Sequence, residues 1–127
     1  MAHILLVEDS DALRMVMRTY LEADHLRVLE ASDGKSALLI CEKLPAIDLI
    51  ITDQNMPELN GMDMLREIRK IPQYAKVPVI FHTTENDKEM KREAEALGVT
   101  GWLVKPAGPK NLKVLIHKIL SSTSPAP

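Results

Sequence analysis

The sequence lacks several features that would mark a secreted, membrane-spanning or nucleic-acid-binding protein. A single cysteine, Cys41, cannot form an internal disulfide, which favours a reducing compartment. The first residues lack the basic region and long apolar run of a signal peptide. No apolar stretch approaches the about 20 residues that span a bilayer, and the net charge of −2 gives no general reason to bind nucleic acid or an anionic membrane. We therefore expect a soluble, cytoplasmic protein with neither as a partner.

What the sequence does contain is one domain of ordinary globular composition. Its 127 residues are 46% hydrophobic and 27% charged, enough to bury a core without disulfides. No repeat or internal linker divides the chain. We place the domain at residues 1–120 and predict a disordered tail at 121–127, which is rich in Ser and Pro.

Short apolar runs alternate with segments of helical periodicity. The runs are typical of buried strands and lie at residues 4–7, 27–30, 49–52, 78–81 and 101–104. Apolar residues recur at helical spacing near 12–21, 35–44, 61–70, 87–97 and 112–120. This alternation predicts a doubly wound α/β fold, a five-stranded parallel sheet with helices on both faces. Ligands of such folds bind beyond the carboxyl ends of the strands.

Reactive side chains fall at those ends. Glu8 and Asp9 follow the first run, Asp53 the third, Thr83 the fourth and Lys105 the fifth. Three crowded carboxylates raise one another's pKa and oppose folding unless a cation neutralises them, and a hydrated set of oxygen ligands suits Mg²⁺. Lys105 suits a carboxylate or phosphate, and the Thr83 hydroxyl can donate to a phosphoryl oxygen.

Several of these residues also have ordinary structural interpretations. Ser10 or Asp11 is expected to cap the helix that begins near Ala12. We interpret Cys41 as a helix core residue and His82 as a residue at a strand end. The charged residues of the 87–97 segment are expected to form a solvated face.

Three enzyme classes share parts of this pattern. A dinucleotide-binding enzyme needs a Gly-rich turn after the first strand, where this chain has acids, and a P-loop NTPase needs a motif that is absent. A Mg²⁺-dependent phosphohydrolase with an aspartyl-phosphate intermediate stays open as the alternative function, because it also uses Asp, Lys, Thr and Mg²⁺. Such enzymes carry a second Asp two residues after the nucleophile, where this chain has Asn55.

Four short motifs follow one another along the chain. They are Leu6-Val7-Glu8-Asp9-Ser10, Asp53-Gln54-Asn55-Met56-Pro57 with Asn60-Gly61, Pro78-Val79-Ile80 leading to Thr83, and Gly101-Trp102-Leu103-Val104-Lys105-Pro106. Any one of them is weak, but their order and spacing are specific. Through them, residues of about 3 to 120 resemble the receiver domain of two-component response regulators.

The resemblance implies a flavodoxin-like strand order, 2-1-3-4-5, and a phosphorelay function. Asp53 would accept a phosphoryl group from a histidine kinase or phosphotransfer protein. Mg²⁺ would be held by Asp9, Asp53 and the backbone carbonyl of Asn55, with Glu8 acting directly or through water. Lys105 would pair with the phosphorylated Asp53 and precede a cis peptide bond at Pro106.

The resemblance also implies a switch made of Thr83 and Trp102, in which the indole turns inward from an exposed position. The helix near 87–97, the strand at 101–104 and the last helix would then bind a downstream target protein. Asn55 and Glu85 resemble the pairing of chemotaxis regulators that lose phosphate quickly. We expect no enzymatic activity beyond the chain's own phosphorylation and dephosphorylation, and a monomer, with dimerisation on phosphorylation left open.

Overall fold

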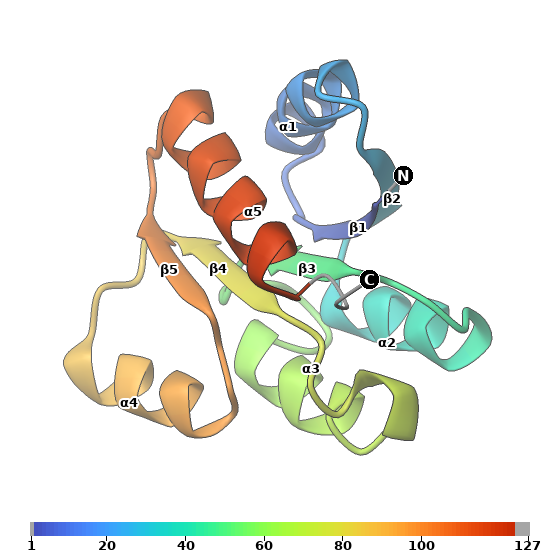
Figure 1. The fold of residues 1–127 in the computed structure, drawn as a ribbon. Coiled ribbons are helices and arrows are strands. Elements are labelled where there is room, and N and C mark those ends of the chain that lie inside the picture. Colours follow the sequence, from blue (N-terminus) through green and yellow to red (C-terminus); the bar gives the residue numbers. More distant parts are fainter. Residues whose placement is uncertain (1, 124–127) are drawn as a thin grey trace.

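The computed structural model describes residues 2–123, which form a parallel sheet between two layers of helices (Figure 1). The strands are β1 (His3–Val7), β2 (Arg27–Ala31), β3 (Leu49–Thr52), β4 (Val79–Thr83) and β5 (Gly101–Val104). Their order is β2-β1-β3-β4-β5, and every neighbouring pair is parallel. The predicted doubly wound fold and its strand order are confirmed.

Helices cover both faces of the sheet. They are α1 (Asp11–Ala23), α2 (Gly34–Lys43), α3 (Gly61–Ile68), α4 (Lys88–Ala96) and α5 (Pro109–Thr123), with a 3-10 turn, η1 (Pro72–Tyr74). In Figure 1, α1 and α5 lie on one face, and α2, α3 and α4 lie on the other. Successive residues of a strand point to opposite faces, so each strand supplies both cores, and the buried central strands β1 and β3 are nearly continuous apolar runs.

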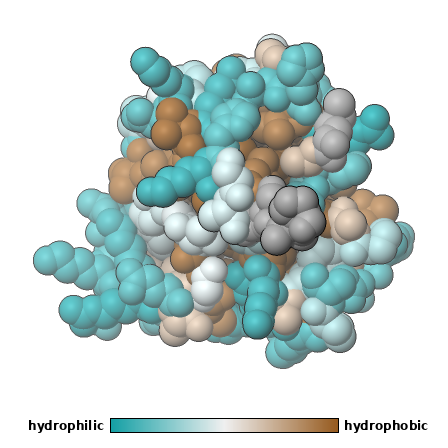
Figure 2. All heavy atoms as spheres, in the orientation of Figure 1, coloured by the Kyte–Doolittle hydropathy of each residue, from teal (hydrophilic) through white to brown (hydrophobic). Residues whose placement is uncertain are grey.

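Polar side chains begin four of the helices. Each accepts a hydrogen bond from a backbone amide three residues on, which satisfies a donor that the first turn leaves free; these residues are Ser10, Asp33, Asn60 and Asp87. Ser10 is thus the cap that the sequence predicted. Gly98, at φ +80°, follows α4 in a backbone conformation that side chains rarely adopt. The surface over α4 is largely hydrophilic (Figure 2), as its charged sequence predicted.

The structure differs from the prediction at three places. β4 continues to Thr83, so His82 lies inside the strand and is only 4% exposed. The 3-10 turn η1 was not predicted, because its three residues are too few to show a helical periodicity. The helix α5 continues to Thr123, three residues beyond the end of the predicted helical segment, and the domain boundary itself stays a prediction. The rest of the predicted tail lies outside the described residues. Cys41 is buried in the core, as predicted. No helix within residues 2–123 is both long and apolar enough to cross a membrane.

Gly61 provides a test of how α3 packs against the loop after β3. A Cβ atom there would lie 2.4 Å from the backbone oxygen of Asp53 and 3.0 Å from the Phe81 ring. We predict that Gly61→Ala lowers the free energy of unfolding by about 1–3 kcal/mol, because overpacking outweighs the better helix propensity of Ala. Gly108→Ala is the control, since a Cβ atom there would meet nothing within 4 Å. Urea denaturation measures both, and equal stabilities would contradict this packing.

Candidate functional site

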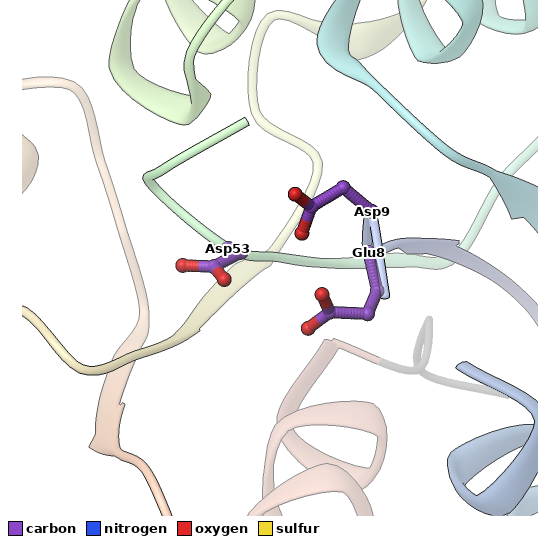
Figure 3. A group of neighbouring side chains, drawn as sticks. All are labelled: Glu8, Asp9 and Asp53. Carbon is purple, nitrogen blue, oxygen red and sulfur yellow. The ribbon is translucent and has the colours of Figure 1, made fainter. Parts of the chain in front are cut away.

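The sheet brings the predicted site residues together at one edge. Glu8 and Asp9 come directly after β1, Asp53 after β3 and Lys105 after β5, while Thr83 is the last residue of β4. Oxygen atoms of the three acids lie within 4.8 Å of one another. Figure 3 shows the three carboxylate groups gathered around a common space. Asp9 is exposed, whereas Glu8 and Asp53 are 2% and 7% exposed.

Lys105 holds the two buried acids. Its Nζ donates to Glu8 Oε1 and to Asp53 Oδ2, each at 2.7 Å. The peptide bond between Lys105 and Pro106 is cis, as the resemblance implied. The sequence predicted contact between Lys105 and a phosphorylated Asp53. In the structure, Lys105 contacts Asp53 already and also pairs with Glu8.

This contact separates the acidities of the two buried carboxyls. Burial raises the pKa of Glu8, against the hydrogen bonds that it accepts from Lys105 and the Ser10 amide. Burial also disfavours charged Asp53, but hydrogen bonds from Lys105 and Thr83, with the charge of Lys105, outweigh it and lower the pKa of Asp53. Burial is the main cause of the raised pKa of Glu8, and the neighbouring Asp9 adds only a smaller increase to it. Asp53 is ionised at neutral pH.

The loop after β3 fixes the other oxygen of Asp53. Asp53 Oδ1 accepts hydrogen bonds from the backbone amides of Gln54 at 2.6 Å and Asn55 at 3.3 Å. The Gln54 side chain is buried, and its Oε1 accepts from the Met62 amide at 2.8 Å. Gln54 thereby ties the loop to the start of α3. The sequence did not predict this role, because nothing in the sequence distinguishes a buried, hydrogen-bonded loop glutamine from an exposed one.

A chain of hydrogen bonds runs from Asp53 toward β5 through Glu85. Thr83 lies against Asp53, and its Oγ1 accepts from the Glu85 amide at 3.2 Å. The Glu85 carboxylate accepts from Asn55 Nδ2 at 3.0 Å, and the Glu85 carbonyl accepts from Trp102 Nε1 at 2.9 Å. The two residues that the resemblance paired, Asn55 and Glu85, are therefore in direct contact.

Trp102 corrects one expectation. The sequence predicted an exposed indole, but Trp102 is only partly exposed. Its ring stacks on buried Phe81, with centroids 5.1 Å apart and planes 3° from parallel. This stacking and the hydrogen bond to Glu85 hold the ring against the sheet. An aromatic pair and a satisfied indole N–H both stabilise this position.

The acidic cluster suits a divalent cation. Three carboxylates and one ammonium leave a formal charge of two negative units at the strand ends. All the groups offered by the acids are hard oxygen donors, and Asp9 is open to water. Mg²⁺ favours such a partly hydrated oxygen site. The residues present therefore fit the metal that the sequence predicted.

The fold and the site define an α/β protein with an acidic, lysine-bridged site at the carboxyl ends of its strands. Within that class, the chain belongs to the response regulator receiver domains, whose family model matches residues 4–117. A chemotaxis protein CheY homolog of Campylobacter jejuni is 34% identical over 122 residues, which cover 95% of this chain and 94% of the relative.

Solved structures agree with this assignment. Vibrio cholerae chemotaxis protein CheY4 has a TM-score of 0.88 and 37% identity, over 94% of this chain and 98% of that one. The receiver domain of the Pseudomonas aeruginosa sensor histidine kinase PA1611, solved with magnesium in its active-site cleft, has a TM-score of 0.85 and 28% identity, over 94% and 98%. The chain is a CheY-like receiver domain of two-component signalling, and the phosphohydrolase alternative is not supported.

Removing the Lys105 ammonium tests its part in the apo fold. Lys105→Met keeps an unbranched side chain of similar length, removes the ammonium group, and leaves Glu8 and Asp53 buried without a cation. We predict that it lowers the free energy of unfolding by about 3–5 kcal/mol in EDTA at neutral pH. Lys110→Met, at an exposed position, should change it by less than about 0.5 kcal/mol. Similar denaturation midpoints for the two variants would show that the acids do not need Lys105.

Proposed function

We propose that Asp53 is the residue that accepts a phosphoryl group, from a phosphohistidine of a histidine kinase or phosphotransfer protein. Receiver domains interact with such proteins and with downstream targets. The observation that carries the proposal is the carboxyl group of Asp53, held on one oxygen by two backbone amides and on the other by Lys105. An oriented carboxylate is a competent nucleophile for phosphoryl transfer.

In the transfer, an oxygen of Asp53 forms a bond to phosphorus while the bond from phosphorus to the donor imidazole nitrogen breaks. The leaving imidazole keeps the bonding electron pair. Lys105 stays beside the reacting oxygens and balances the added negative charge. The Thr83 hydroxyl, already against Asp53, donates to a phosphoryl oxygen.

Receiver domains bind Mg²⁺ at an acidic pocket, and we propose that Asp9, Asp53 and the Asn55 carbonyl are the ligands here, with Glu8 acting directly or through water. The bound ion would offset the charge of the phosphoryl oxygens. The acidic cluster and the magnesium in the PA1611 receiver structure support this assignment.

We further propose that the chain catalyses only its own phosphorylation and dephosphorylation. A phosphohydrolase of the aspartyl-phosphate type needs a carboxyl acid/base two residues after the nucleophile. Asn55 stands at that position, and its amide nitrogen is bonded to Glu85.

Phosphorylation of Asp53 is directly measurable. Incubation of the chain with acetyl phosphate and Mg²⁺ should add one phosphoryl group, seen as a mass increase and located at Asp53 by peptide mapping. Asp53→Asn should remove the label, and EDTA should suppress it. The control is Asp63→Asn, at an exposed position on α3. Labelling of Asp53→Asn equal to that of the control would refute the assignment.

We propose that Thr83 and Trp102 carry the signal to the surface formed by α4, β5 and α5, where a target protein binds. Phosphorylation brings the charge of Asp53 to about −2 and adds acceptor oxygens. A Thr83 that turns toward them gives up the hydrogen bond from the Glu85 amide. Glu85 also holds the indole through its carbonyl, so a shift of Glu85 changes the setting of Trp102.

Trp102 is the only tryptophan of the chain, so its fluorescence reports on this switch. We predict that beryllofluoride with Mg²⁺ changes Trp102 emission or its quenching by acrylamide. Thr83→Ala should reduce that change at least severalfold, because the hydroxyl couples Asp53 to Glu85. Thr84→Ala, the exposed neighbour, should leave it intact. An unchanged spectrum in protein shown by mass spectrometry to be fully phosphorylated would refute the switch and leave the role of Asp53 standing.

A further inference from the structure

Arg14 is a largely buried charged residue that the proposed chemistry at Asp53 does not use. It lies on α1, and its side chain is 17% exposed. Its Nη1 donates to the backbone carbonyl of Glu8 at 2.7 Å. The other two nitrogens pair with acids, Nε with Glu30 at 3.2 Å and Nη2 with Asp11 at 2.6 Å. The guanidinium thus ties α1 and β2 to the point at which the chain leaves β1.

The bond to the Glu8 carbonyl bears on Asp9, because the carbonyl of one residue and the amide of the next form one planar group. The Glu8 amide donates to the Ala31 carbonyl at 3.0 Å, so Arg14 completes the anchoring of the Glu8 main chain on both sides. Asp9 is exposed, and packing therefore does little to place its carboxylate. The direction of the peptide group then decides where this carboxylate lies relative to Asp53, toward which it is turned in Figure 3.

Arg14 contributes direction to this peptide group rather than charge to the site. Its positive charge is offset locally by Asp11 and Glu30. A cation near the acidic cluster would by itself weaken the binding of a divalent ion, because like charges repel. The planar guanidinium carries its donors in a rigid fork, which fixes an orientation that the single ammonium of a lysine does not fix.

We propose that Arg14 is a positioning residue for the magnesium site, which holds the Glu8–Asp9 peptide group in the direction that metal binding needs. Because the metal site is itself proposed, this role rests on the proposed function of the acidic cluster. The hydrogen bonds of Arg14 go to the main chain and to acids outside the cluster, so it acts through the position of the ligands. Groups that orient metal ligands in this way typically contribute about 10- to 100-fold to metal affinity.

Binding of Mg²⁺ to the unphosphorylated, full-length chain tests this role. The dissociation constant is measured by titration with Mg²⁺ while the amide chemical shifts of Asp9 and Asn55 are followed. We expect Arg14→Met to weaken Mg²⁺ binding about tenfold, whereas loss of a positive charge alone would leave binding unchanged or make it tighter. Unchanged or tighter binding would overturn the proposal.

Arg18→Met is the matched control. Arg18 also lies on α1, but its side-chain hydrogen bonds within residues 2–123 go to Glu22 and Glu30 and not to the Glu8 carbonyl. The variant removes the same charge, so its Mg²⁺ affinity should not fall, and an equal loss in both variants would contradict a role through Glu8. If Arg14→Met fails to fold, Arg14→Lys decides, since it keeps the charge and loses the fork. We expect it to weaken Mg²⁺ binding about threefold, and wild-type affinity would overturn the proposal.

The rate of phosphorylation separates positioning from a merely structural role. With acetyl phosphate as donor, Arg14→Met should react slowly at low Mg²⁺ and approach the wild-type rate at saturating Mg²⁺, because the metal ligands are displaced but still present. A rate that stays low at saturation would overturn the proposal. Failure of the wild-type chain to label at Asp53 would instead refute the proposed function, and the Mg²⁺ titrations would still decide the role of Arg14.

Discussion

The rest of the site depends on one interaction, the pairing of the Lys105 ammonium with both Glu8 and Asp53. At an effective dielectric constant of about 20, unit charges about 4 Å apart attract by about 4 kcal/mol, whereas desolvating each ion costs several kcal/mol. The two contributions nearly cancel, so the site is tolerated rather than strongly stabilising. A site in such balance responds to small additions of charge. A divalent cation beside Asp9 or a phosphoryl group on Asp53 can therefore shift the arrangement of charges, because the net stabilisation of the apo arrangement is small.

Local sequence patterns predict the fold wherever the spacing of apolar residues matches the residues that are buried. The apolar runs of β1 and β3 are buried because helices cover both faces, and this is why the sequence pattern indicates strands there. The end of β4 carries no such apolar signal, since His82 and Thr83 are polar. These residues are strand residues because β5 pairs with them, Leu103 with His82 and Val104 with Thr83, which is a tertiary effect. The last turn of α5 was missed because serine and threonine favour caps and turns over helix interiors, so their sequence predicts a tail.

The candidate site was predictable as a set of positions but not as a geometry. Parallel strands bring their carboxyl ends to one edge, so the positions of the acids and of Lys105 could be inferred without coordinates. The bridge from Lys105 to Glu8 and the opposite pKa shifts of Glu8 and Asp53 depend on side-chain rotamers and burial. The orientation of Trp102 depends likewise on Phe81 and on the Glu85 carbonyl, neither of which marks the position in sequence.

The end of β4 connects the site to both faces of the sheet. Because neighbouring residues of a strand point to opposite faces, Thr83 lies toward Asp53, Glu85 and the indole, while His82 lies toward a pocket beside α1. Lys105 belongs to both sets, since it pairs with Asp53 and also lines this pocket. A phosphoryl group on Asp53 would draw on the ammonium that also neutralises Glu8, so its arrival changes the charge balance of both buried acids and the charge that His82 senses from Lys105.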